Sequence, residues 1–175
     1  MLSLLIEGPG KVGGSVTTGG NKNAVLPMIA AAMLTDEEVI LHNVPEIIDV
    51  ENMLHLASEL GASVRRENKT VILKAENLKT NRLPQEICSA LRTSLLFAGP
   101  VAVRTGEAVL WPPGGDVIGR RRLDAHFYGL RKLGIQIESE EIPYVFHRTS
   151  RRTASGADLF LDEASVTATE HIMTT

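Results

Sequence analysis

The segment Leu-Gly-Ala-Ser-Val at residues 60–64 returns as Leu-Gly-Ile-Gln-Ile at residues 133–137, and these two copies define the architecture of the chain. Apolar residues recur at helical spacing before each glycine and alternate after it. Because glycine commonly ends helices, each copy predicts a helix that stops and a β-hairpin that follows. Upstream landmarks correspond as well: Lys22 with Arg92, and Glu38 with Glu107. The chain therefore contains a repeat of roughly 70 residues, well outside the usual solenoid periods.

Each repeat predicts a βαβαββ unit, so the fold class is α/β, built from α+β repeats. The two complete units span about 21–80 and 84–148, and a third begins over 157–175. In the third unit we expect a strand at residues 159–161 and a helix that opens at Ser165. A helix barely begun leaves its apolar face unpaired, so we expect this chain to be a fragment, or a truncated relative, of a longer protein.

The first unit contains several local signals. Residues 1–20 predict short strands broken by glycine. Asn23 is predicted to cap a helix that is apolar all round and so buried on every side, with Pro27 near its first turn. Asp49 is predicted to cap the second helix.

The second unit repeats that order. Apolar residues from Ile87 to Leu95 predict a helix that ends before Gly99-Pro100, because this pair interrupts the apolar pattern. Residues 109–111 predict a strand that runs into a proline turn. Residues 123–133 then predict the second helix of the unit.

Composition narrows the function classes. The chain has 175 residues, of which 43% are hydrophobic and 22% charged, with a net charge of −3. This indicates an ordinary globular protein, and mild acidity argues against nucleic acid as a partner. The single cysteine, Cys88, excludes a disulfide framework and favours a cytoplasmic location. No run of apolar residues is long enough for a membrane span, and the scattered histidines indicate no metal site and no cofactor.

One loop combines glycine with charge. Pro112-Pro113-Gly114-Gly115 must form a turn, and it is followed by Asp116 and by three arginines at residues 120–122. A carboxylate beside fixed guanidinium groups could protonate or position a small anionic substrate, which arginine binds bidentately. A glycine turn followed by a solvated basic run is the alternative, and the loop alone favours it.

Three stretches resemble the UDP-N-acetylglucosamine enolpyruvyltransferases. They are Gly-Asn-Lys-Asn-Ala-Val-Leu-Pro at residues 20–27, Arg-Thr-Ser at residues 92–94 and Pro-Gly-Gly-Asp-Val-Ile-Gly-Arg-Arg at residues 113–121. The resemblance implies two domains of three βαβαββ units in an inside-out α/β barrel, here incomplete. Residues 1–20 would then belong to the other domain, and residues 21–175 to the loop-bearing domain.

The resemblance also implies a reaction. The family transfers the enolpyruvyl group of phosphoenolpyruvate to the 3-hydroxyl of UDP-N-acetylglucosamine, the first committed step of peptidoglycan synthesis. The family's pattern places phosphoenolpyruvate on Lys22 and Asn23, and the nucleotide sugar on further residues of this chain. Those residues are Arg92, Arg121, Arg122, Leu123, Asp124, Ala125, Glu163, Ala164, Ser165 and Val166. From its residue type alone, Asp124 is predicted to cap the helix that follows, as an alternative to a hydrogen bond with the uracil edge. Arg92 could pair with a carboxylate inside a helix.

Three positions depart from the common family pattern. Asp116 stands where most members carry the cysteine that acts as general acid, and aspartate can donate a proton but cannot form a thioether. Epoxide antibiotics of the fosfomycin type should therefore not label it. Glu163 stands where a lysine is common, and Thr167 where a glycine is common.

Two other hypotheses remain. The chain could be a non-catalytic nucleotide-sugar-binding module, because the general base and further arginines lie in the C-terminal half of family members. It could also belong to the sister enzymes that act on shikimate phosphate, although these lack the Pro-Gly-Gly loop at residues 113–115.

Overall fold

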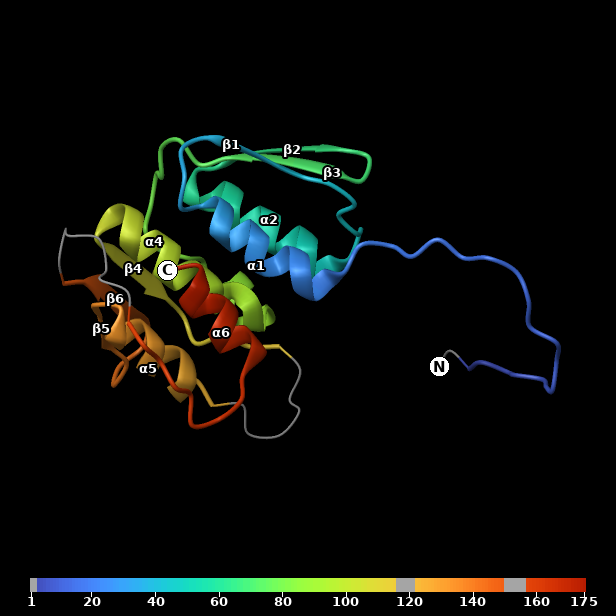
Figure 1. Cartoon of the computed structure of the whole chain (residues 1–175). Helices are drawn as coiled ribbons and strands as arrows, with labels where there is room; N and C mark the ends of the chain where they lie inside the picture. Colours follow the sequence, from blue (N-terminus) through green and yellow to red (C-terminus); the bar gives the residue numbers. More distant parts are fainter. Residues whose placement is uncertain (1–2, 116–121, 150–156) are drawn as a thin grey trace.

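A computed structural model describes residues 3–115, 122–149 and 157–175. Each repeat forms one three-stranded antiparallel sheet, and the helices pack between the two sheets (Figure 1). Residues 3–20 extend away from this body and form no strand (Figure 1). The predicted strands in this segment are therefore wrong for this structure, because a strand needs a neighbour for its backbone groups and the segment meets none.

The first unit contains α1 (Lys22–Ala32), β1 (Glu38–Leu41), α2 (Ile48–Leu60), β2 (Ser63–Glu67) and β3 (Thr70–Lys74). Its strands lie in the order β1-β3-β2.

The second unit contains α3 (Gln85–Ala90), η1 (Arg92–Phe97), α4 (Ala98–Thr105), β4 (Glu107–Leu110), α5 (Asp124–Lys132), β5 (Ile135–Glu138) and β6 (Tyr144–Arg148). Its strands lie in the order β4-β6-β5, and α6 (Val166–Met173) begins the third unit.

The repeat is confirmed by matched registers. Glu38 lies opposite Lys74 where β1 pairs with β3, and Glu107 lies opposite His147 where β4 pairs with β6. Both predicted hairpins form, and each is preceded by a glycine with positive φ, 111° at Gly61 and 84° at Gly134. The first strand of the second unit is reduced to one parallel bridge between Arg82 and Val109.

The start of α1 differs from the prediction in three respects. Its cap is Asn21, whose side chain accepts hydrogen bonds from the backbone N–H groups of Asn23 and Ala24. Pro27 lies in the second turn, where it has no N–H to donate to the carbonyl of Asn23. Ala24 and Met28 are exposed, so the helix is not buried on every side. Asn21, and not Asn23, is the cap because its side-chain oxygen accepts from two N–H groups that have no acceptor within the helix.

The long helix predicted around Ile87–Leu95 is wrong. The chain turns extended at Leu91 (φ −132°, ψ 116°), which separates α3 from η1. α4 then runs through Gly99-Pro100 instead of ending before it. Pro100 is the third residue of α4, in the first turn, where an N–H has no acceptor within the helix and its loss costs little.

The caps predicted at Asp49 and Asp124 are also wrong. α2 begins after Ile47 and α5 after Leu123, and neither helix has a side-chain cap. Both aspartates lie in the first turn, where they favour the positive end of the helix dipole. In the third unit the predicted helix start at Ser165 is confirmed, and the Ser165 hydroxyl caps α6 by accepting from the Ala168 N–H at 3.2 Å. The strand predicted at residues 159–161 does not form.

One apolar core runs through both units, with Leu56 and Leu73 of the first and Phe97 and Phe146 of the second fully buried. A single arginine also connects the units. Arg104 of α4 donates to the carbonyl oxygens of Met33, Ala75 and Glu76, at the ends of α1 and β3. These carbonyls would otherwise have no helical or strand partner, so the contact fixes one repeat against the other.

Candidate functional site

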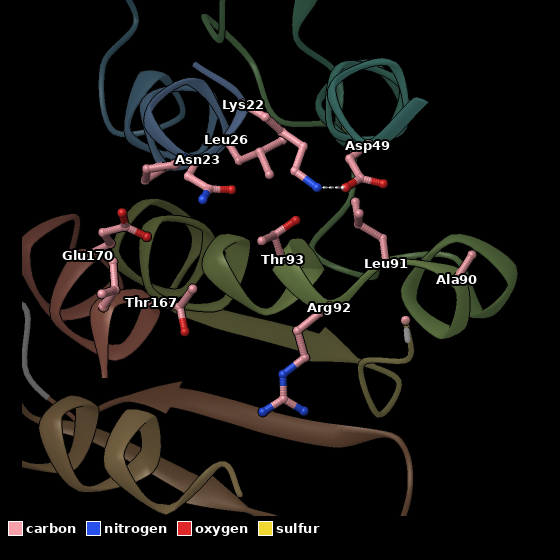
Figure 2. Close-up of a pocket in the computed structure, with 13 residues that line it drawn as sticks. Lys22, Asn23, Leu26, Asp49, Ala90, Leu91, Arg92, Thr93, Thr167 and Glu170 are labelled. Atoms are coloured by element: carbon pink, nitrogen blue, oxygen red, sulfur yellow. Dashed lines mark hydrogen bonds and ion pairs between the residues drawn. The ribbon is translucent and has the colours of Figure 1, made fainter. Parts of the chain in front are cut away.

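The corresponding helices of the three units begin at one place. A pocket of about 370 Å³ is lined by the first two residues of α1, of η1 and of α6. These residues are Lys22, Asn23, Arg92, Thr93, Val166 and Thr167. Figure 2 shows Lys22 of α1 and, from a second helix, Arg92 and Thr93 of η1 around the pocket. Each helix start presents the positive end of its dipole, and two of the six side chains are cationic, so the pocket is suited to an anion.

Lys22 is already paired. Its ammonium nitrogen lies 2.7 Å from a carboxylate oxygen of Asp49, and both side chains are about one-third exposed or more (Figure 2). Asp49 is thus the partner of a predicted site residue, a role that its position as a candidate cap concealed. An anion that contacts Lys22 must compete with this carboxylate.

Arg92 and Thr93 form the centre of the pocket wall. The Arg92 guanidinium donates to the carbonyl of Arg122 at 3.0 Å, which brings η1 to the start of α5. The Thr93 hydroxyl is buried and has no hydrogen-bond partner among the described residues, so a ligand in the pocket could satisfy it. On the opposite wall, burial raises the pKa of Glu170.

The glycine loop approaches the pocket through backbone contact. The Gly114 N–H donates to the carbonyl of Cys88 at 2.9 Å, and a Cβ on Gly114 would lie 1.6 Å from the carbonyl oxygen of Ser89. Gly115 has φ 94° and lines the pocket. Only glycine fits at both positions. Asp116 and Arg121 lie outside the described residues.

A second hollow, of about 170 Å³, lies beside the first. It is lined by Arg92, Arg122, Ala125, His126, Glu163, Ala164, Ser165 and Thr167. Arg92 and Thr167 belong to both hollows, so the two are continuous. Described residues of all three stretches that carry the family resemblance thus meet along one groove.

Two predicted residues lie off this groove. Leu123 precedes α5 and lines neither hollow, and Asp124 lines a neighbouring depression. The Asp124 carboxylate accepts from Arg122 Nε at 2.8 Å, and this hydrogen bond raises the pKa of the arginine. Val166 lines the first hollow rather than the second.

A buried histidine pair reaches the second hollow through His126, and sequence reasoning missed it. His126 of α5 and His171 of α6 have their Nδ1 atoms 3.2 Å apart, and His171 Nε2 accepts from the Gly99 N–H. Desolvation lowers the pKa of His126 to about 4, with the charge of Arg92 as a second cause. Desolvation and the neighbouring ring lower that of His171 to about 3. Both rings are therefore neutral at pH 7.

Within residues 3–115, 122–149 and 157–175, no group of three or more histidine, cysteine, aspartate or glutamate side chains could hold a metal ion. Nor does any helix in those ranges have the length and apolar character to cross a bilayer.

Curated relatives share one name, UDP-N-acetylglucosamine 1-carboxyvinyltransferase. The chain is 48% identical over 173 residues to the protein of Treponema denticola and 50% identical over 169 residues to that of Treponema pallidum. It is 42% identical over 175 residues to that of Bradyrhizobium diazoefficiens. These alignments cover 96–98% of this chain but only 39% of each relative.

Solved structures show the same fold at low identity. The enolpyruvyl transferase NikO from Streptomyces tendae superposes with a TM-score of 0.67 at 20% identity, over 81% of this chain and 31% of that one. EPSP synthase from Acinetobacter baumannii superposes with a TM-score of 0.67 at 17% sequence identity, over 92% of this chain and 37% of that one. The EPSP synthase family matches residues 6–175. That match spans nearly the whole sequence and agrees with the repeat, so the chain belongs to the EPSP synthase (3-phosphoshikimate 1-carboxyvinyltransferase) family.

Proposed function

We propose that this chain is the N-terminal portion of an enzyme that transfers the enolpyruvyl group of phosphoenolpyruvate to the 3-hydroxyl of UDP-N-acetylglucosamine. This is a cytoplasmic step that commits the sugar to peptidoglycan. The observation that carries the proposal is the convergence of three helix starts, Lys22 and Arg92 on one pocket. The shared name of the relatives supports the choice of substrate.

Phosphoenolpyruvate fits the first hollow by charge. It carries a phosphate and a carboxylate, which the helix starts and the two cations can bind before any chemistry occurs. Lys22 exchanges its ion pair with Asp49 for the ligand anion, and Asn23 is the adjacent amide at the same helix start. The unpartnered hydroxyl of Thr93 supplies a further hydrogen bond.

The nucleotide sugar then occupies the second hollow. Arg92 and Arg122 bind its diphosphate, since guanidinium groups bind phosphate oxygens bidentately. Ala125, Ala164 and Ser165 shape the wall of that hollow. Arg121, Leu123, Asp124, Glu163 and Val166 complete the proposed nucleotide-binding set. Glu163 carries a negative charge at a position where a positive charge would attract the diphosphate, so it weakens diphosphate binding on its side of the second hollow.

Asp116 is the proposed general acid. It follows Gly115, which lines the first hollow, and its carboxyl group would donate a proton to the methylene carbon of phosphoenolpyruvate. The sugar oxygen bonds to the neighbouring carbon and its hydroxyl proton goes to a base, which gives a tetrahedral intermediate with a methyl group. Phosphate then leaves while a base removes a proton from that methyl carbon, so that the carbon–carbon double bond re-forms. By resemblance, the base and further arginines belong to the C-terminal half of family members.

A non-catalytic nucleotide-sugar-binding chain is the second candidate. It is favoured by length, because this chain spans about two-fifths of the relatives that it matches. The two candidates share the binding site and differ in turnover.

Calorimetric titration of the chain with UDP-N-acetylglucosamine, with and without phosphoenolpyruvate, tests the proposal. We expect binding that Arg92→Met weakens about tenfold. Arg65→Met, on the exposed face of β2, should leave it intact. Phosphate release in the same mixture would distinguish an enzyme from a binding module. Competition by shikimate 3-phosphate, or equal binding by the Arg92→Met variant, would overturn the assignment.

A further inference from the structure

We propose that the His126–His171 pair is a positioning device that fixes the Thr167 hydroxyl as a hydrogen-bond donor to a phosphate oxygen of the ligand. The inference deepens the proposed function, on which its choice of ligand rests. It rests on His126 of α5 and His171 of α6, which neither the family motifs nor the charge pattern singled out, and on Thr167, which stands where the family commonly has glycine.

The direction of the chain of hydrogen bonds follows from one fixed donor. The backbone N–H of Gly99 lies 3.2 Å from His171 Nε2, and a backbone N–H can only donate. His171 Nε2 must therefore carry a lone pair. A neutral ring with a lone pair on Nε2 carries its proton on Nδ1.

That proton determines the state of the second ring. His171 Nδ1 and His126 Nδ1 are 3.2 Å apart, so His171 donates and His126 accepts. A neutral His126 then carries its proton on Nε2, which lies 3.4 Å from the Thr167 hydroxyl oxygen. The hydroxyl accepts from the ring, and its own proton is left to donate elsewhere.

Both rings must be neutral for this order to hold, and their surroundings keep them so. Burial lowers both pKa values, and Arg92 and the neighbouring ring add to that effect. Three described carboxylates line the groove: Asp49 and Glu170 in the first hollow and Glu163 in the second. Asp49 pairs with Lys22, and none of the three forms a described ion pair with a histidine of this pair.

Close helix packing holds the rings in place. A Cβ on Gly129 of α5 would lie 2.2 Å from the terminal carbon of Ile172, and a Cβ on Gly99 would lie 1.9 Å from the Thr175 hydroxyl. The side chains of Ile172, on α6, and of Thr175, just after it, fill the space beside these two glycines, so the third unit packs closely on α5 and α4. This close packing supports the geometry of the pair.

The hydroxyl stands where an anion would lie. Thr167 and Arg92 line both hollows and are thus at the junction between them. A phosphate oxygen at that junction could accept from the hydroxyl and from the guanidinium together. Threonine at this position thereby adds a side-chain donor that glycine would not supply.

Two measurements test the device. Nitrogen-15 spectra of the histidine side chains should show His171 protonated on Nδ1 and His126 on Nε2. In titrations with UDP-N-acetylglucosamine, and separately with inorganic pyrophosphate as an anion probe, Thr167→Val should weaken binding about tenfold. Thr167→Ser should retain binding, and Thr169→Val, whose hydroxyl bonds to the Ser165 carbonyl, is the matched control.

Variants of the pair separate positioning from packing. His171→Leu frees His126 to protonate Nδ1 and accept from Thr167, so it should weaken binding as much as Thr167→Val, with no further loss in the double variant. His171→Asn keeps an N–H near Nδ1 and should restore binding even if it lowers stability. Full binding by Thr167→Val, or His171 protonated on Nε2, would overturn the inference and leave the proposed function intact. Pyrophosphate binding that depends on Thr167, without nucleotide-sugar binding, would support the inference and overturn the function.

Discussion

The two complete repeats build the same close contact with opposite residues. In the first unit a Cβ on Gly20, just before α1, would lie 1.7 Å from the carbonyl oxygen of Asn43 in the connection after β1. In the second unit the glycine is Gly114, in the connection after β4, and the facing carbonyl belongs to Ser89, before η1. Two backbone segments touch at this point in both units, and the glycine that makes room for the contact can lie on either segment.

The connections that leave this contact differ in length and chemistry. After β1 the chain reaches α2 within a few residues, from His42 to Ile47, whereas after β4 it runs from Trp111 to Leu123 before α5 begins. The longer connection contains Asp116 and the three arginines. In the first unit the contact lies in a short connection between a strand and a helix. In the second unit it lies at the base of the long loop that we propose carries the general acid.

The largest difference that can be measured between the units concerns pH. α5 buries His126 where α2 of the first unit buries Met53. The pKa values of His126 and His171 in the folded chain lie below the unfolded value of 6.5, so the unfolded chain binds more protons between pH 7 and pH 5. The free energy of unfolding therefore decreases as the pH is lowered through this range. We expect each histidine to account for a decrease of about 2 kcal/mol.

Urea unfolding at both pH values checks this expectation. His126→Met, which copies the first unit, should remove that residue's share of the loss. His55→Gln, at an exposed position on α2, should not. An unchanged pH dependence in the His126→Met variant would contradict the assignment of the buried pair.

The shared contact should be equally intolerant in both units. Gly20→Ala and Gly114→Ala each force a Cβ against a carbonyl oxygen, and we expect each to lower the free energy of unfolding by about 2–3 kcal/mol. Gly10→Ala, where a Cβ meets nothing within 4 Å, serves as the control. If only one of the two variants were destabilised, the equivalence of the two contacts would be wrong.

Removing the hydrogen bonds by which Arg104 connects the two units should lower the free energy of unfolding by less. Arg104→Met leaves the carbonyls of Met33 and Ala75 without their donor, and we expect a loss of about 2 kcal/mol in thermal or urea unfolding. Arg65→Met removes an equally long side chain from an exposed ion pair and should change stability little. Two separate unfolding transitions in the Arg104→Met variant would show that the Arg104 hydrogen bonds, and not the shared apolar core, make the two units unfold together.

The smallest expected effect compares the two cations at corresponding helix starts. Lys22→Met and Arg92→Met should each weaken phosphoenolpyruvate binding about tenfold, measured by calorimetry in the presence of UDP-N-acetylglucosamine. Because Asp49 offsets the charge of Lys22 beforehand, Asp49→Asn should strengthen phosphoenolpyruvate binding. Weaker binding by Asp49→Asn would mean that the carboxylate positions Lys22 instead of competing for it.

Local signals predicted much of the fold. Gly61 and Gly134 end helices because glycine alone tolerates the positive φ that each adopts, and the hairpins after them follow from alternation. The boundary errors share a cause, which is tertiary contact. Leu91 interrupts an apolar pattern that is locally continuous, at the point where the glycine loop docks on Cys88.

The site divides in the same way. Lys22, Asn23 and Arg92 were predicted because their motifs are short and contiguous, and the structure brings them to one pocket. His126 and His171 lie far apart in sequence and share no motif, so only the packing of α5 on α6 shows that they meet. The choice of Asn21 over Asn23 as cap likewise depended on side-chain geometry that two nearby asparagines do not reveal.

The outer edge of β1 bears on how the protein behaves in concentrated solution. In the second sheet the bridge at Arg82 occupies the matching edge of β4, but among the described residues none pairs with β1 on that side. Ile40 on this strand is half exposed, and the extended residues Leu4, Leu5 and Ile6 are almost fully so. An open strand edge and an extended apolar segment are complementary, so one molecule can add a strand to the next. Self-association should therefore rise with concentration, and Ile40→Lys should suppress it.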